Sequence, residues 1–185
     1  IESVIAQSYL NWELILIDDA STDSSVSNVK NGISDPRIRI ICEKNNRGAN
    51  YCRNKGLREA CGQYVIFLDA DDLLKPWCLN NRVALMEKNA NADLSVHSMD
   101  TFKSKPGDSH LLWIPKSKNP LKDFLKHDLP WQTMQPIWKK DFLLKLNGFD
   151  ENFVRLQDVE LHTRALLQPD VSFILSPGVP DCSYR

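Results

Sequence analysis

The sequence lacks any apolar run close to the roughly 20 residues that a membrane-spanning helix requires. It also does not open with the basic and apolar segments of a signal peptide. Its 23 Lys and Arg residues are scattered along the chain and balanced by 24 Asp and Glu residues. This balance gives no support for a nucleic acid or an acidic membrane as the main partner. We therefore expect a cytoplasmic domain, with at most a peripheral association with the inner face of a membrane.

Paired cysteines are missing as well. The five cysteines are odd in number and widely spaced, and no two of them form a C-x-x-C pair. This pattern argues against a zinc site or a disulfide framework and predicts free thiols in a reducing compartment. The cysteines are Cys42, Cys52, Cys61, Cys78 and Cys182.

The chain length fits a single domain that can bury a core without a metal or disulfide staple. Its first residues, Ile1 to Gln7, have the pattern of the end of a helix. A domain seldom begins in this way, so we expect a fragment without its first strand.

Three short apolar runs predict strands at residues 13–17, 37–41 and 64–68. The first and third runs are almost continuously apolar, which is typical of strands buried on both faces of a parallel sheet. Helical patterns lie between them at 23–34 and 49–61, the first preceded by N-cap residues and the second followed by Gly62. Alternating strands and helices predict an α/β fold with a mostly parallel, Rossmann-like sheet flanked by helices.

The second half of the chain has weaker signals. We expect helices at about 76–89, 141–146 and 156–168, and strands near 93–98, 136–139 and 171–175. Residues 101–119 contain several Pro and Gly residues and predict a long loop.

Acidic residues follow two of the predicted strands. Asp18 and Asp19 come after the first strand, and Asp69, Asp71 and Asp72 come after the third. Ligands of open α/β sheets bind beyond the carboxyl ends of the strands. Carboxylates gathered there need a positive partner, and Mg²⁺ or Mn²⁺ prefers such oxygen ligands. The alternative is that these residues form turns and helix caps, which suits Asp72 in particular and stays open for Asp18.

Four ordered segments together resemble glycosyltransferase family 2. They are 7–23, with Asp18-Asp19-Ala20-Ser21; 46–57, with Asn46-Arg47-Gly48 and Arg53-Asn54; 62–72, with Asp69-Ala70-Asp71; and 148–164, with Gly148-Phe149-Asp150 and Gln157-Asp158. Each segment alone would be a weak signal, but their order along one chain makes the resemblance specific.

The resemblance implies a GT-A fold and transfer of a sugar, with inversion, from a nucleotide-sugar donor that is expected to be a UDP-sugar. It implies that Asp18 and Asp19 bind the base, Asp69 the ribose, and Asp71 a divalent metal, Mn²⁺ or Mg²⁺. Arg53 would lie near the nucleotide, and Asp158 would act as the general base. Residues 1–98 would form the nucleotide-sugar and metal-binding part, and residues 99–185 the acceptor-binding part.

Several alternatives accompany this interpretation. Without the resemblance, Asp158 would be interpreted as an acidic residue favoured in the first turn of a helix. His162 is expected to be a packed or solvated helix residue rather than a ligand. Trp131 and Trp138 could line a sugar pocket or belong to the core.

Two other functions would also fit the carboxylates: a nucleotidyltransferase on a related fold, and a carbohydrate- or nucleotide-binding domain without turnover. We expect the acceptor to be a glycan or a lipid-linked saccharide. The expected pathway is the assembly of a bacterial surface polysaccharide.

Overall fold

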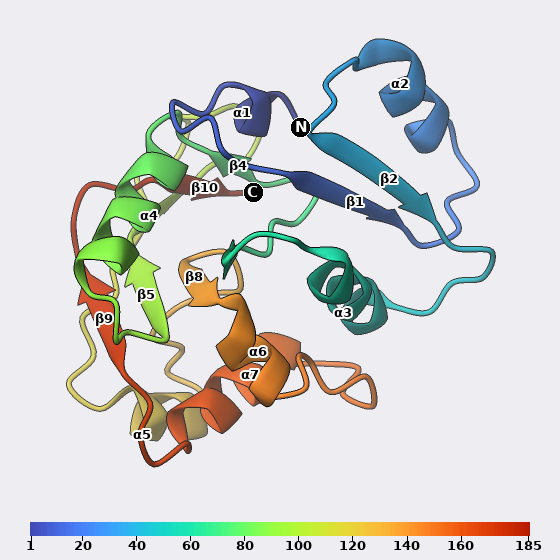
Figure 1. The fold of residues 1–185 in the computed structure, drawn as a ribbon. Helices are drawn as coiled ribbons and strands as arrows, with labels where there is room; N and C mark the ends of the chain where they lie inside the picture. Colours follow the sequence, from blue (N-terminus) through green and yellow to red (C-terminus); the bar gives the residue numbers. More distant parts are fainter.

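The computed structural model describes residues 1–185 and has a mixed α/β architecture (Figure 1). The elements follow in the order α1 (Glu2–Ile5), β1 (Leu14–Asp18), α2 (Ser25–Gly32), β2 (Ile38–Cys42), α3 (Ala49–Glu59), β3 (Tyr64–Val65), β4 (Leu73–Leu74), α4 (Cys78–Lys88), β5 (Leu94–His97), β6 (Met99–Thr101), β7 (Leu112–Trp113), α5 (Pro120–Leu125), β8 (Pro136–Lys139), α6 (Lys140–Lys145), α7 (Gln157–Leu166), β9 (Phe173–Ser176) and β10 (Cys182–Tyr184). No helix has the length and apolar character needed to cross a bilayer.

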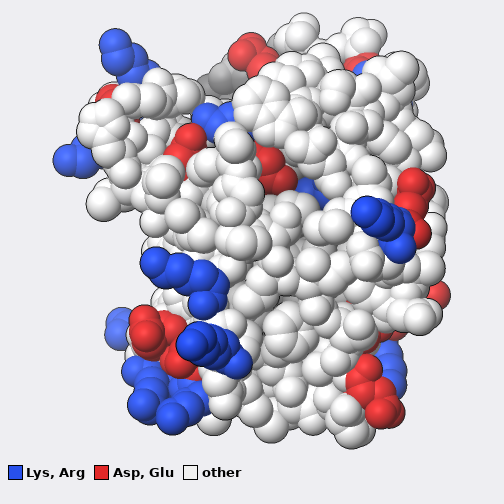
Figure 2. Space-filling view, turned by 90° about the vertical axis from the view of Figure 1, so that its left-hand side faces the viewer, with Lys and Arg blue, Asp and Glu red and all other residues white.

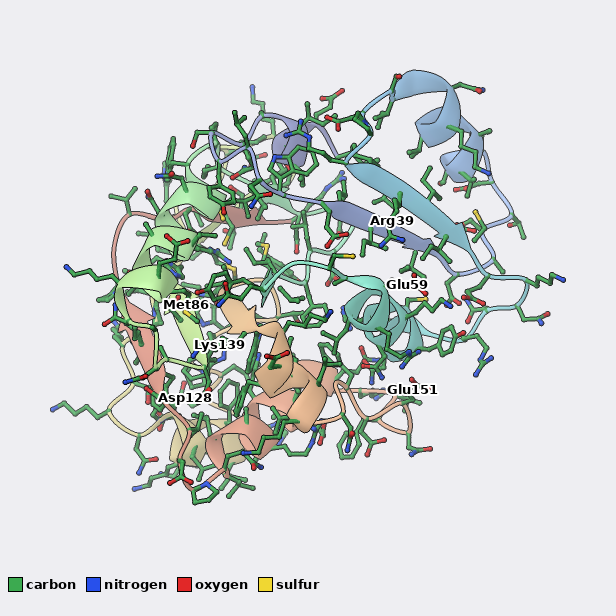
Figure 3. All side chains as sticks on the ribbon, in the orientation of Figure 1. Arg39, Glu59, Met86, Asp128, Lys139 and Glu151 are labelled. Atoms are coloured by element: carbon green, nitrogen blue, oxygen red, sulfur yellow. The ribbon has the colours of Figure 1, made fainter.

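Strands β1 and β2 form a parallel pair at one side of the molecule, and α3 lies beside them (Figure 1). Arg39 on β2 and Glu59 at the end of α3 point toward each other in Figure 3, with an N–O distance of 3.6 Å. All five residues of β1 are only half-buried. No residue of β1 is fully buried, so the expectation of a strand fully buried on both faces was wrong.

The sheets contain both parallel and antiparallel ladders, and the expected α/β architecture with sheets flanked by helices is confirmed (Figure 1). Two four-stranded sheets have the orders β4-β10-β6-β7 and β3-β8-β5-β9. Over all sheets, three ladders are parallel and four are antiparallel. The antiparallel ladders are β4–β10, β3–β8, β5–β8 and β6–β7, and each of them includes one of the strands β4, β7 and β8.

The predicted strand at 64–68 is shorter than expected. Only Tyr64 and Val65 pair with β8, and residues 66–68 belong to no ladder before they reach Asp69. The predicted strand at 136–139 matches β8, and the predicted helix at 156–168 contains α7. The expected loop at 101–119 is mostly irregular but includes β7, which pairs with β6.

The largest hydrophobic cluster lies between the second half of the chain and α3. Trp131 and Trp138 are at most 1% exposed and belong to this core, so they do not line a sugar pocket. His162 is buried and stacks on Trp138, with ring centroids 5.6 Å apart and planes 11° from parallel. The expectation of a packed His162 is confirmed.

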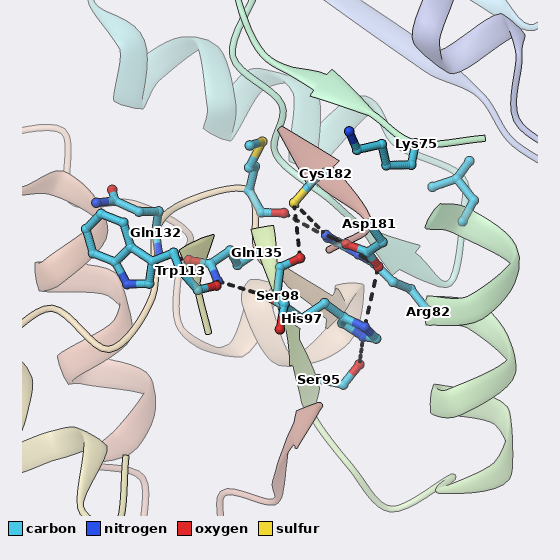
Figure 4. A network of polar contacts seen from close by, with 12 residues as sticks. Lys75, Arg82, Ser95, His97, Ser98, Trp113, Gln132, Gln135, Asp181 and Cys182 are labelled. Carbon is cyan, nitrogen blue, oxygen red and sulfur yellow. Dashed lines mark hydrogen bonds and ion pairs between the residues drawn. The ribbon is translucent and has the colours of Figure 1, made fainter. Parts of the chain in front are cut away.

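A buried polar network joins α4 to the ends of β5 and β10 (Figure 4). The Arg82 guanidinium is fully buried and donates to both carboxylate oxygens of Asp181, at 2.9 and 2.6 Å. It also donates to the Met134 carbonyl at 2.7 Å. Gln135 accepts from the Gln132 amide and donates to the carbonyls of His97 and Trp113. A buried charge is costly without partners, so Arg82 must keep its bond to the Met134 carbonyl. Together with the hydrogen bonds of Gln135, this bond fixes the path of residues 132–135.

Two buried histidines couple the fold to pH. Burial lowers the pKa of His162 to about 3 and that of His97 to about 4, from an ordinary value of 6.5. Below pH 6.5 these histidines bind more protons in the unfolded chain than in the folded chain. The free energy of unfolding therefore decreases as pH falls from 6.5 toward the folded-state pKa values.

We predict that His162→Phe, which keeps an aromatic ring but cannot be protonated, flattens the decline of stability between pH 6.5 and pH 4. The slope should decrease by up to about 1.4 kcal/mol per pH unit, the value of one proton. Urea unfolding followed by circular dichroism at several pH values measures this slope. An unchanged slope would contradict the burial argument for His162.

Candidate functional site

A cleft of about 370 Å³ lies between the end of β3, the start of α7 and the C-terminal strand β10. It is lined by residues from distant parts of the sequence: Arg53, Asp69, Asp72, Gln132, Thr133, Met134, Val154, Arg155, Leu156, Gln157, Asp158 and Tyr184. Of the predicted site residues, the cleft brings together Arg53, Asp69 and Asp158. Asp18, Asp19 and Asp71 do not line it.

Arg53 connects the two sides of this cleft. It lies on α3 and donates to Asp69 Oδ1 at 2.8 Å and to Gln157 Oε1 at 2.9 Å. One guanidinium group therefore holds the carboxylate after β3 and the residue before Asp158. The planar, multidentate geometry of Arg suits this double contact, which Lys could not reproduce.

Two buried asparagines on α3 hold the segment that leads to Asp158. Asn50 donates to the carbonyls of Asp150 and Phe153, at 2.7 and 3.0 Å. Asn54 accepts from the Phe149 amide at 2.8 Å and donates to the Phe149 carbonyl at 2.9 Å.

Asn54 also donates to Glu151 Oε1 at 2.9 Å; Figure 3 labels Glu151 in the loop next to α3. We call Asn50, Arg53 and Asn54 the α3 clasp. Through its contacts with 149–157, this clasp sets the position of the segment relative to α3 and Asp69.

Asp158 lies in the first turn of α7 and is half-buried in the cleft. Burial raises the pKa of its carboxyl above the ordinary value, while the amide of Val159 and the charge of Arg53 act in the opposite direction. A carboxylate with a raised pKa accepts a proton more readily, as a general base requires. Its neighbour Glu160 is instead paired with Arg164 at 2.6 Å.

The carboxylates after β1 have local partners. Asp19 accepts hydrogen bonds from the amides of Arg47 and Gly48, at 2.7 and 2.8 Å, and Asp18 accepts one from Ser21 at 3.3 Å. Gly48 has a φ of 88° and precedes α3 directly. Asp19 thus braces the turn that starts α3, which is the turn-forming role left open for these residues.

Asp72 is a cleft residue that the sequence interpretation assigned to a turn or cap. It is 6% exposed and accepts a hydrogen bond from the Arg185 amide at 3.0 Å. Burial, opposed by that hydrogen bond and reinforced by Asp69 and Asp71, raises the pKa of its carboxyl to about 6. Its position directly after Asp69-Ala70-Asp71 was the only sequence signal. The contact with Arg185 spans 113 residues and leaves no local pattern.

The acidic segment 69–72 provides oxygen ligands for a divalent cation, but not a complete protein site. No group of three or more His, Cys, Asp or Glu side chains in the structure could hold a metal ion. Asp71 is exposed and takes part in none of the ion pairs of the chain. One or two carboxylates suffice where substrate phosphates and water complete the shell, so the residues fit such an ion.

Outside the cleft, charge is dispersed. On the face in Figure 2, Lys and Arg side chains lie among Asp and Glu side chains, with wide uncharged areas between them. The surface in this view thus has the same mixed character as the composition.

Comparison with known proteins gives three findings. The model described as Glycosyl transferase family 2 matches residues 1–143. The succinoglycan biosynthesis protein ExoO of Rhizobium meliloti is 35% identical over 155 residues, which cover 77% of this chain and 43% of ExoO. The UDP-Glc:alpha-D-GlcNAc-diphosphoundecaprenol beta-1,3-glucosyltransferase WfgD of Escherichia coli is 38% identical over 89 residues, 48% of this chain and 35% of WfgD.

Solved structures have the same fold at lower identity. TarS 1-349 of S. aureus in complex with UDP-GlcNAc aligns with a TM-score of 0.79 at 18% identity, over 98% of this chain and 52% of that one. The mannosyltransferase PcManGT of Pyrobaculum calidifontis, in complex with GDP-Man and Mn²⁺, aligns with a TM-score of 0.71 at 21% identity, over 98% and 50%. The GT-A expectation is thus confirmed. The chain spans less than half the length of the curated relatives it matches.

The α3 clasp leads to a stability prediction at Gly148. Gly148 has a φ of 65°, and an added Cβ would lie 2.2 Å from Asn54 Oδ1. Gly107 also has a positive φ, 90°, but an added Cβ would meet nothing within 4 Å. Substitution by alanine would therefore strain the backbone at both glycines, but only at Gly148 would the new Cβ clash with a neighbouring side chain.

We predict that Gly148→Ala lowers the free energy of unfolding by about 1–3 kcal/mol more than Gly107→Ala, because Asn54 must leave its buried partners. Urea unfolding of both variants measures the difference. Equal losses would show that the Asn54 contacts do not constrain the segment.

Proposed function

Because this chain belongs to glycosyl transferase family 2, we propose that the protein transfers a sugar from a nucleotide-sugar donor to a hydroxyl group of an acceptor. The observation that carries the proposal is the cleft in which Arg53, Asp69 and Asp158 meet. This arrangement joins a donor-side carboxylate and a half-buried carboxylate with a raised pKa in one cleft. Such a pair supports a reaction in which a proton is removed beside a bound nucleotide.

The donor we propose is a UDP-sugar. The name of WfgD includes UDP-Glc, and TarS was solved with UDP-GlcNAc. In this proposal residues 1–98 bind the donor: Asp69 contacts the ribose, and Asp18 and Asp19 lie toward the base. The side chain of Asp19 accepts hydrogen bonds from the turn that begins α3, so Asp19 would act partly by holding that turn.

A divalent cation, Mn²⁺ or Mg²⁺, would be held by Asp71 together with the donor diphosphate. When bound, it would stabilise the negative charge that develops on the leaving diphosphate. The complex of PcManGT with GDP-Man and Mn²⁺ supports this role.

Asp158 is the proposed general base of an inverting displacement. The acceptor oxygen attacks the anomeric carbon, its proton passes to Asp158, and the bond between that carbon and the diphosphate oxygen breaks. The electron pair of this bond leaves on the diphosphate. Attack from the face opposite the leaving group inverts the anomeric centre, and alignment of the two substrates in the cleft supplies much of the rate.

The acceptor we propose is a glycan or a lipid-linked saccharide, bound by residues 99–185. The name of WfgD supports a lipid-linked saccharide as acceptor, and the name of ExoO supports assembly of a bacterial polysaccharide. The wall of the cleft formed by Gln132, Thr133 and Met134 offers polar side chains and a buried, fixed backbone for such a sugar.

We predict that Asp158→Asn lowers the rate of sugar transfer by about 10²- to 10⁴-fold, because the acceptor proton loses its base. The dissociation constant for UDP should change little. The assay follows release of UDP from UDP-glucose with a lipid-diphosphate GlcNAc acceptor. Asp170→Asn, an exposed carboxylate outside the cleft, is the matched control and should retain activity. Full activity of Asp158→Asn would rule out this base. Release of pyrophosphate from UTP and a sugar 1-phosphate, in a separate assay without UDP-glucose, would instead indicate a nucleotidyltransferase.

A second prediction concerns the cation. Asp71→Asn should remove the increase in UDP affinity that Mn²⁺ produces, because a neutral amide is a much weaker ligand for a hard cation. Isothermal titration of UDP with and without Mn²⁺ measures this increase for the wild type and the variant. If Mn²⁺ strengthens UDP binding equally in both, Asp71 is not the ligand.

A further inference from the structure

The cleft contains two arginines, and only one of them is engaged. Arg53 is largely buried, and its guanidinium is used by Asp69 and Gln157. Arg155 lines the same cleft, is exposed, and takes part in none of the ion pairs of the chain. The cation that the sequence interpretation placed at the nucleotide thus has an internal role, while a second cation is available.

The backbone around Arg155 is held on both sides. Asn50 bonds the carbonyl of Phe153 at 3.0 Å, and Arg53 bonds the side chain of Gln157 at 2.9 Å. Leu156, between them, has a left-handed conformation with φ 52° and ψ 39°. This conformation costs a non-glycine residue on the order of 1–3 kcal/mol and persists only where the surroundings enforce it. Arg155 is therefore presented to the cleft by a constrained segment, not by a free loop.

Because the cleft is rich in carboxylates, a bound anion needs a cation there, and Arg155 is the lining arginine that no carboxylate pairs with. Asp69, Asp72 and Asp158 line the cleft, and of these only Asp69 is paired with an arginine. A bound nucleoside diphosphate would add further negative charge to this space. A guanidinium without an internal partner can form two parallel hydrogen bonds to phosphate oxygens without breaking an ion pair.

We propose that Arg155, which shares the cleft with Asp69 and Asp72, binds the diphosphate group of the nucleotide donor. Arg155 would then share the negative charge of the leaving diphosphate with a cation that Asp71 would hold. This inference rests on the proposed function, since it assigns a residue to the same donor site.

The test compares a nucleoside diphosphate with its nucleoside. Isothermal titration with Mn²⁺ present measures the binding of UDP, GDP and uridine to the wild type, Arg155→Gln and Arg155→Lys. The matched control is Arg58→Gln, since Arg58 is an exposed arginine of α3 that lies outside the cleft and is also in none of the ion pairs.

Arg155→Gln should weaken binding of the preferred diphosphate by about tenfold to hundredfold, the range for hydrogen bonds to a charged group. Arg155→Lys should weaken it less, and Arg58→Gln should leave it unchanged. Uridine binding should not respond to Arg155→Gln.

Two results would overturn the inference alone: equal diphosphate affinity in Arg155→Gln and the wild type, or equal weakening of uridine and UDP. A wild-type protein that binds neither UDP nor GDP would instead overturn the proposed function, and this inference with it.

Discussion

The contact between α3 and residues 149–157 is the constraint on which the site depends. Asn50 and Asn54 are 4% exposed, so their amide groups need partners within the protein. They find them on a segment about 100 residues later in the chain, at Asp150, Phe153 and Phe149. Arg53, on the same helix, adds Asp69 and Gln157. One helix thereby sets the distance between the carboxylate that follows β3 and the carboxylate at the start of α7.

The other walls of the cleft depend on a second buried network. Arg82 and Asp181 form an ion pair that is 0% and 4% exposed at its side chains, and Arg82 also holds the Met134 carbonyl. Such a pair contributes little net stability compared with apolar packing, but removing either member is costly. This buried ion pair lies next to residues 132–134 and β10, which line the cleft. It therefore helps to set the shape of the cleft wall.

Much of the donor side was predictable from local patterns. The apolar runs before Asp18 and Asp69 indicate strands, and carboxylates at strand ends indicate a ligand site. Asp158 was identified through resemblance, because a helix start explains an acidic residue equally well. The pairing of β10 with β4 and β6, the burial of Asp72, and the free guanidinium of Arg155 could not be predicted. These depend on contacts between residues far apart in sequence, which hydrophobic period and turn residues do not encode.

The central claim is that a single cleft, held by α3, brings the donor diphosphate and the general base together. A crystal structure of the protein with UDP and Mn²⁺ tests it most directly, since the manganese ion can be located by its anomalous signal. We expect manganese density at Asp71 and a diphosphate that lies in the cleft within reach of Asp158. Nucleotide density outside this cleft, for example in the separate hollow beside Asp93, Lys139 and Asp170, would contradict it.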